Sequence, residues 1–124
     1  MKIYISHSSN FDFKKELYEL LKSSEFLSRH DLILPHEKTV LSTNSKEIIN
    51  HCDLLIAEVS YPSIGLGIEL GWAENAKVKI ICLHKSDTRI SSSLPLLFPN
   101  IFTYTNSVEM LEKIIIFMKK ELTF

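Results

Sequence analysis

The sequence predicts a small doubly wound α/β domain of the flavodoxin-like or Rossmann-like kind, with a five-stranded parallel sheet and helices on both faces. The first observation is that short β-rich runs alternate with segments of helical period along the chain. The second is that residues 54–59 and 79–83 are nearly continuous apolar runs, as strands buried on both faces must be. The third is size, because 124 residues with 45% hydrophobic content suffice for one core, so residues 1–124 are expected to form a single domain.

Five strands are predicted, and each is a short run rich in β-branched, aromatic or other apolar residues. They cover residues 2–6, 31–35, 54–59, 79–83 and 101–104. Ligands of doubly wound sheets bind at the carboxyl ends of the strands. The segments to examine for function are therefore residues 6–10, 35–38, 60–69 and 84–93.

The helices between the strands are predicted from caps and from apolar spacing. Asn10 can cap a first helix whose apolar face runs from Phe13 to Leu21. Asn44 followed by Glu47 is a capping-box pattern for a short second helix, and a third helix is expected around residues 64–76. Asn106 with Glu109 repeats the capping pattern for the last helix.

Charge and composition exclude several function classes. A formal net charge of −1 argues against nucleic-acid binding over a broad surface, because such binding needs an excess of basic residues. The five histidines show no paired spacing on one helix face, so we expect no metal site. Cys52 and Cys82 lie in apolar runs and are expected to be buried free thiols. No signal peptide or membrane-spanning segment is predicted, so a cytoplasmic location is expected.

All three glycines of the chain lie between the third strand and the following helix, at Gly65, Gly67 and Gly71. Glycines at such a junction let a ligand approach the backbone, and helix N–H groups favour an anion. The alternative is that they only permit a tight turn and close helix–sheet packing. A dinucleotide-binding motif is rejected, because it belongs in the first βα turn and has a different glycine spacing.

Glu69 is the most informative side chain of this window. We predict that it lies at the helix start, where the helix dipole favours its ionised form. An oriented carboxylate in a ligand cleft suits nucleophilic attack on a sugar carbon. The alternative is the ordinary enrichment of acidic residues in a first helical turn.

Weaker candidates lie at other strand ends. Tyr4, near the end of the first strand, could orient a carboxylate or could simply be a strand aromatic. His36 and Glu37 follow the second strand and either reach the cleft or form a solvated loop. The serines at positions 91–93 could contact a phosphate or form an ordinary hydroxyl-rich turn.

Residues 52–83, CDLLIAEVSYPSIGLGIELGWAENAKVKIICL, resemble the core of the nucleoside 2-deoxyribosyltransferase superfamily, and most of all its 2′-deoxynucleoside 5′-phosphate N-hydrolase branch. The opening KIYISHSS is similar to the first strand of that branch, so the resemblance covers nearly the whole chain. It implies cleavage of the N-glycosidic bond of a 2′-deoxynucleoside or its 5′-monophosphate, without a cofactor. Water releases the sugar in a hydrolase, and a second base captures it in a transferase.

The resemblance also implies roles for individual residues. Glu69 is the expected nucleophile, and Tyr4 is the tyrosine that contacts it. Substrate contacts are expected from the first loop, the glycine window and a serine lent by the partner in a homodimer or larger homo-oligomer, at His7, Ser8, Ser63, Gly65, Gly67 and Ser92.

Two positions depart from the pattern of that branch. An aspartate thought to assist the leaving base is replaced by Ser45, and a glycine of the first loop is replaced by His7. A serine hydroxyl transfers protons poorly near neutral pH. Either an acid elsewhere takes this role, with His36 and Glu37 ranking above Glu47, or activity is weak.

Three alternatives stay open. The replacement at Ser45 favours a nucleotide-binding module without turnover. The run YISHSS before an amphipathic helix is similar to TIR domains, some of which cleave the glycosidic bond of NAD. The five successive apolar residues 114–118 could serve oligomerisation or could pack the last helix on two sides within one chain.

Overall fold

The computed structural model describes residues 1–37 and 44–122 and confirms the predicted fold class. Five parallel strands form one sheet in the order β2-β1-β3-β4-β5. They are β1 (Lys2–His7), β2 (Asp31–Ile33), β3 (Leu54–Glu58), β4 (Lys79–Lys85) and β5 (Ile101–Tyr104). The order reverses between β1 and β3, and ligands of such sheets bind at this kind of switch point.

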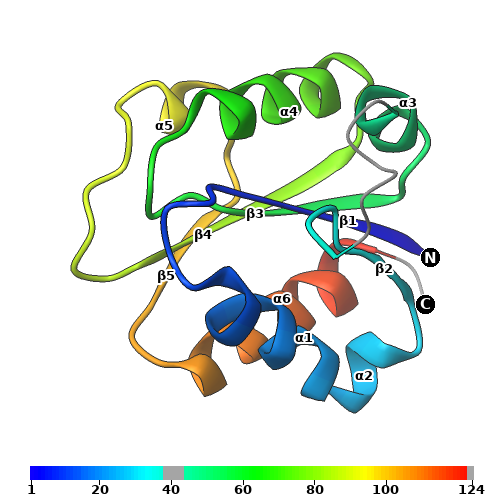
Figure 1. Ribbon diagram of the computed structural model, residues 1–124, viewed down its shortest axis with the longest axis vertical. Helices are drawn as coiled ribbons and strands as arrows, with labels where there is room; N and C mark the ends of the chain where they lie inside the picture. The colour runs from blue at the N-terminus through cyan, green and yellow to red at the C-terminus, as the bar shows by residue number, and fades with distance from the viewer. Residues whose placement is uncertain (38–43, 123–124) are drawn as a thin grey trace.

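Two helical layers cover the sheet (Figure 1). On one side lie α3 (Ser45–Asn50), α4 (Ile64–Asn75) and α5 (Leu94–Leu97). On the other lie a π-helical segment, η1 (Lys14–Tyr18), which runs directly into α1 (Glu19–Ser23), then α2 (Glu25–Ser28) and α6 (Ser107–Glu121).

The central strands divide their side chains between two hydrophobic cores. Alternate side chains of a strand point to opposite faces, so Ile3 and Ile5 join the core beneath α1 and α6. Tyr4 joins the other core, with Leu66 and Leu70 of α4. All five residues of β3 are buried, which explains the continuous apolar runs in the sequence.

The structure corrects several predicted element ends. The first helical segment begins after Phe13 rather than at Asn10, and the Asp12 carboxylate accepts a hydrogen bond from the Lys15 N–H at 3.4 Å. Asn44 occupies the N-cap of α3, but its side chain makes no capping hydrogen bond, so the predicted capping box is absent. The second strand ends at Ile33 rather than at residue 35. Two single-turn helices, α2 and α5, were not predicted because four residues carry no helical period.

The last helix, α6, has the predicted N-cap at Asn106, and most of its apolar run at residues 114–118 packs against the core. The Asn106 side chain accepts a hydrogen bond from the Glu109 N–H at 2.9 Å. Within residues 114–118, Ile114, Phe117 and Met118 are buried in the core, whereas Ile116 is exposed. The run therefore mainly packs the helix within one chain, and it offers little surface for a partner.

Candidate active site

The first strand places two hydroxyl groups beneath helix α4. Tyr4 and Ser6 are two residues apart on β1, so both side chains point to the face that α4 covers. Neither is accessible to solvent. Each hydroxyl needs a hydrogen-bond partner in this buried position, and both find one on the same residue.

That residue is Glu69. The Tyr4 hydroxyl donates to Glu69 Oε2 at 2.6 Å, and the Ser6 hydroxyl donates to Oε1 at 2.8 Å. Glu69 is half-buried, and within residues 1–37 and 44–122 it takes part in no ion pair. The carboxyl group is thus held through both oxygens by neutral donors, with no cationic partner among the described residues.

The predicted place of Glu69 at the helix start is wrong. Helix α4 begins at Ile64, no acidic residue lies in its first turn, and Glu69 lies in the second turn. The helix dipole acts mainly within the first turn, so it contributes little at this position. The two β1 hydroxyls orient the carboxylate instead.

Tyr4 remains a hydrogen-bond donor over a wide pH range. Burial, and then the hydrogen bond to Glu69, raise the pKa of Tyr4 well above its usual value near 10. The phenol therefore stays protonated wherever the carboxylate is charged. A fixed donor of this kind orients a carboxylate without neutralising it.

All three glycines lie inside α4 and have ordinary helical backbone angles. Apart from neighbouring residues and the backbone of α4 itself, a Cβ atom added to any of them would meet no atom of the described structure within 4 Å. Glycine inside a helix costs about 0.5–1 kcal/mol relative to alanine. The tight-turn and close-packing alternative therefore has no support, and the surface of α4 beside the three glycines is open.

Ser63 forms the N-cap of α4. Its hydroxyl accepts a hydrogen bond from the Leu66 N–H at 3.1 Å. Because a hydroxyl can donate while it accepts, Ser63 still has its hydrogen for an anion. Gly65 and Gly67 lie in the turns that follow, so these three predicted contact residues are brought to one helix end.

The loop after β1 is arranged around His7, which is buried. His7 Nδ1 lies 2.7 Å from the Ser8 carbonyl, which can only accept, so this nitrogen carries the proton. Nε2 then accepts from the Tyr18 hydroxyl at 2.6 Å. Burial lowers the pKa of His7 to about 4. With both nitrogens occupied, His7 shapes the loop and has no free atom for a ligand.

Ser8 is also buried, and its hydroxyl accepts from the Asn10 N–H at 3.0 Å. Its hydroxyl hydrogen therefore remains available. The structure does not bring Ser8 into any hydrogen bond with Glu69, so its predicted substrate contact stays a prediction.

Within the described residues, none of the proposed replacement acids forms a hydrogen bond or an ion pair with Glu69. The His36 ring packs on His7, and the backbone N–H of His36 donates to the Tyr18 hydroxyl at 3.2 Å. Glu37 forms an ion pair with Lys22 of α1, on the opposite side of the sheet from α4.

The position of the missing aspartate lies on α3. Ser45 is half-buried at the start of this helix. Glu47 is exposed, and its Oε1 lies 3.5 Å from Nδ1 of His51.

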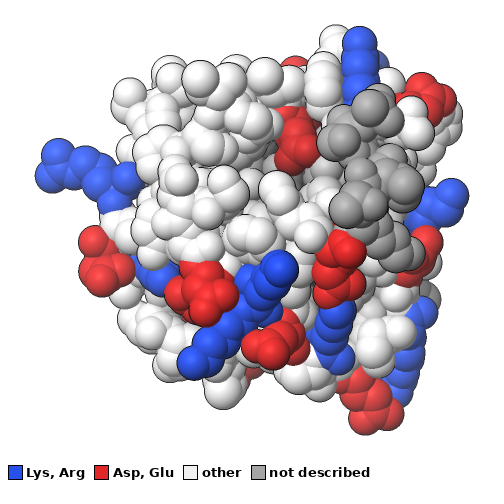
Figure 2. All heavy atoms as spheres, in the orientation of Figure 1, with Lys and Arg blue, Asp and Glu red and all other residues white. Residues whose placement is uncertain are grey.

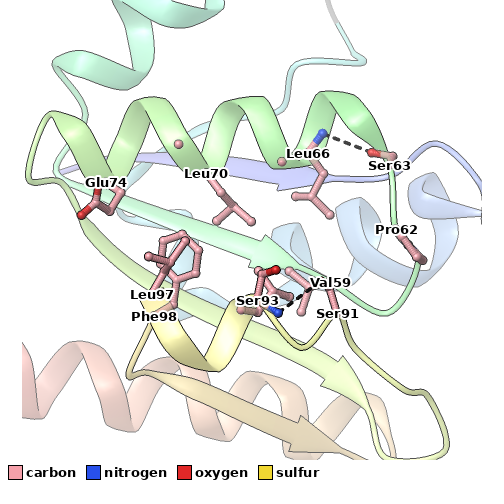
Figure 3. Close-up of a pocket in the computed structure, with 13 residues that line it drawn as sticks. Val59, Pro62, Ser63, Leu66, Leu70, Glu74, Ser91, Ser93, Leu97 and Phe98 are labelled. Carbon is pink, nitrogen blue, oxygen red and sulfur yellow. Dashed lines mark hydrogen bonds between the residues drawn. The ribbon is translucent and has the colours of Figure 1, made fainter.

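A groove of about 370 Å³ runs between α4 and α5 and is mostly apolar. Figure 3 shows Leu66 and Leu70 pointing from α4 towards Leu97 and Phe98. Ser91 and Ser93 also line the groove and lie beside Val59 in Figure 3, whereas Ser92 does not line it and is exposed. Glu69 does not line this groove, because its side chain leaves α4 towards β1.

The sequence reasoning missed Ser6 as a partner of Glu69. Strand alternation could have found it, because the residue two positions after Tyr4 must lie on the same face. It also missed a second carboxylate cluster, at Glu58, which is buried. The Ser60 N–H and hydroxyl donate to Glu58 at 2.7 Å and 2.8 Å, and the Tyr104 hydroxyl donates to the same side chain.

Within the described ranges, no helix is long and apolar enough to cross a membrane. The same residues contain no group of three or more His, Cys, Asp or Glu side chains placed to hold a metal ion.

Comparison with known proteins confirms the resemblance inferred from the sequence. The chain is 35% identical over 85 residues to a Methanosarcina mazei protein named "Putative 2′-deoxynucleoside 5′-phosphate N-hydrolase 1", an alignment of 61% of this chain and 53% of that one. It is 32% identical over 78 residues to the 5-hydroxymethyl-dUMP N-hydrolase of Tetraodon nigroviridis, with 61% and 50% aligned. The chain thus spans about half the length of the curated relatives it matches. No family model matches it.

A solved structure supports the fold over most of the chain. The CMP N-glycosidase BcmB of Clostridium botulinum superposes with a TM-score of 0.68 over 93% of this chain and 99% of that one. Sequence identity is 23%, so this likeness establishes a shared architecture.

Proposed function

We propose that the protein cleaves the N-glycosidic bond of 2′-deoxynucleosides or their 5′-monophosphates, with Glu69 as the nucleophile. One observation carries the proposal: Glu69 is half-buried, and each of its carboxylate oxygens accepts a hydroxyl hydrogen bond from β1. The sequence similarity to two N-hydrolases of deoxynucleotides supports the substrate class.

The reaction has two steps. A Glu69 oxygen attacks C1′ of the deoxyribosyl group, an O–C1′ ester bond forms, and the C1′–N bond breaks with its electron pair going to the base. A water molecule then attacks C1′ and the ester bond breaks, which returns the carboxylate. In a transferase, the nitrogen of a second base replaces that water.

The proton for the departing base comes from solvent in this proposal. Glu37 is paired with Lys22 on the other side of the sheet, and Ser45 offers only a hydroxyl. A base that takes a proton from water leaves hydroxide, which the proton released in the second step neutralises. We therefore expect slow turnover and a preference for bases that leave readily.

Phosphate recognition is assigned to the start of α4. Ser63 keeps its hydroxyl hydrogen free, and the first N–H groups of a twelve-residue helix favour an anion. Gly65 and Gly67 leave room for the phosphate and the sugar. Ser92, exposed beyond the groove, is assigned to the phosphate of the neighbouring protomer.

A homodimer fits the face formed by α4 and α5. Ile64, Ile68, Leu96 and Leu97 are large apolar side chains exposed there. Figure 2 shows that charged side chains on this view gather over α1 and α2, whereas the region over α4 and α5 is nearly free of them. Burial of apolar groups on this face would bring Ser92 towards a second copy.

The dimer is tested by light scattering of the native chain and of Leu97→Glu. We expect a native dimer that the charged substitution converts to monomers, with unchanged circular dichroism. A native monomer at micromolar concentration would contradict the homodimer and the role of Ser92.

The activity is tested by chromatography of free bases released from a panel of deoxynucleosides and deoxynucleoside 5′-monophosphates, with NAD included. Release from the native protein and none from Glu69→Gln is expected. Retention of the deoxynucleotide-induced rise in melting temperature without any base release would instead identify a binding module. Nicotinamide release from NAD alone would identify the TIR-like alternative.

A further inference from the structure

Ser6 shares Glu69 with Tyr4, and neither the sequence pattern nor the resemblance assigns it a role. Its side chain is fully buried, and its hydroxyl donates to Oε1 at 2.8 Å while Tyr4 holds Oε2. A carboxylate with a separate donor on each oxygen has two chemically distinct ends. The question is which oxygen attacks the sugar.

The position of Ser6 on β1 distinguishes the two oxygens. Ser6 lies two residues further along the strand than Tyr4, which is about 6.6 Å closer to the carboxyl edge of the sheet. Ligands of doubly wound sheets bind at this edge. Oε1, the oxygen that Ser6 holds, is therefore on the ligand side of the carboxylate.

The two donors also differ in how easily they release the oxygen. Once an oxygen bonds to C1′, it becomes the bridging oxygen of an ester and a poor hydrogen-bond acceptor, whereas the other oxygen becomes the carbonyl. The Ser6 hydroxyl can turn away by rotation about one bond. The Tyr4 ring is locked in the core beneath α4 and keeps donating to Oε2.

We propose that Ser6 is a positioning residue that presents Glu69 Oε1 to C1′ as the attacking oxygen and then releases it. This inference rests on the proposed function. In the attack, the Oε1–C1′ bond forms and the C1′–N bond breaks with its electron pair on the base. Ser6 transfers no proton and only redirects its hydrogen bond.

The test replaces Ser6 by alanine and by threonine. Ser6→Ala removes the hydroxyl with little change in volume, and we expect kcat to fall about tenfold while KM stays within about twofold. Ser6→Thr restores a hydroxyl in a residue suited to a strand, and should recover kcat to within about threefold of native.

Ser60→Ala is the matched control. Ser60 is also a buried serine whose hydroxyl donates to a glutamate, at Glu58, which the proposed reaction does not use. Ser60→Ala should lower the melting temperature and leave kcat near native. A native kcat in Ser6→Ala, or a fall in kcat that Ser6→Thr does not recover, would overturn the positioning role.

A second readout follows the covalent step directly. A deoxynucleotide with fluorine on C2′ slows breakdown of the ester, because fluorine destabilises the positive charge that develops on the sugar. Intact mass spectrometry should show a sugar adduct on the native protein, and about tenfold slower adduct formation in Ser6→Ala.

The outcomes separate the two proposals. An active native protein with equal labelling of Ser6→Ala overturns only the role of Ser6. A native protein that releases no base and forms no adduct overturns the proposed function and this inference together.

Discussion

In the part of the chain that the structure describes, two carboxylates each accept a hydrogen bond from a tyrosine hydroxyl, and they differ in what surrounds them. Glu58 at the end of β3 is 1% exposed, and Ser60 and Tyr104 supply three donors to it. Glu69 on α4 is half-buried and has two donors. Hydrogen-bond donors alone therefore do not distinguish a nucleophile from a structural carboxylate. Solvent exposure separates the two, because Glu58 is buried and Glu69 is half-buried.

The two clusters also connect different parts of the molecule. The Glu58 cluster joins the carboxyl ends of β3 and β5, and the Ser60 hydroxyl further accepts from the Lys85 N–H at 2.9 Å. The Glu69 cluster joins β1 to α4. We infer that Glu58 stabilises the carboxyl edge of the sheet, whereas Glu69 is the proposed nucleophile.

The largest effect is expected from Glu69→Gln. An amide cannot form the ester, so base release should fall about a thousandfold or more. The melting temperature should change little, because the amide oxygen can still accept one hydroxyl hydrogen bond. Chromatography of released base measures the first quantity. Glu74→Gln, exposed on the same helix, should retain native activity.

The same substitution at Glu58 should give the opposite result. Glu58→Gln replaces a buried carboxyl group that accepts three hydrogen bonds, and we expect a loss of about 2–3 kcal/mol in the free energy of unfolding. Activity per folded molecule should stay near native. Urea denaturation checks the first expectation. A large fall in kcat without loss of stability would mean that Glu58 takes part in the reaction.

The two tyrosines offer a matched pair of hydroxyl deletions. Tyr4→Phe removes a hydrogen bond to the charged carboxylate, so kcat should fall about thirtyfold, which corresponds to about 2 kcal/mol. Tyr104→Phe should cost stability and leave kcat unchanged. Because burial raises the pKa of Tyr4, the native protein should show no loss of activity from ionisation of this phenol up to pH 10.

The smallest effect is expected for the pH dependence of stability that His7 causes, on the face of the sheet opposite Glu69. Burial lowers the pKa of His7 from 6.5 to about 4, so the unfolded chain binds more protons between these values. The contribution of His7 to stability is therefore present above pH 6.5 and is lost as the pH falls towards 4. We expect a decrease of about 1–2 kcal/mol by pH 5.

Urea denaturation at several pH values measures this dependence. His7→Gln should flatten this dependence, whereas His51→Gln, at the exposed C-cap of α3, should leave it unchanged. The pKa of His30 is also lowered, by burial first, so His30→Gln separates its contribution in the same window. An unchanged slope in His7→Gln would show that the ring is not held neutral.

Much of the fold followed from local patterns. The alternation of apolar runs and helical segments predicted five strands and a parallel sheet, because two-sided burial requires apolar strands such as residues 54–58. Short helices were missed because α2 and α5 carry four residues each. Capping at Asn10 and Asn44 was mispredicted because a side-chain cap depends on where the backbone turns, which residue type alone does not fix.

For the candidate site, too, the sequence predicted some features and the tertiary structure decided the others. The sequence by itself determined the alternation that places Tyr4 on the α4 face of the sheet, and it provided Glu69 among the three glycines. Only the tertiary structure decided that Ser6 is the second hydroxyl donor to Glu69 and that Glu37 forms an ion pair with Lys22. It also decided that the surface of α4 beside the glycines is open. The reason is that a strand fixes the direction of its own side chains locally, whereas the partner that each side chain meets depends on how helices from distant parts of the chain pack over the sheet.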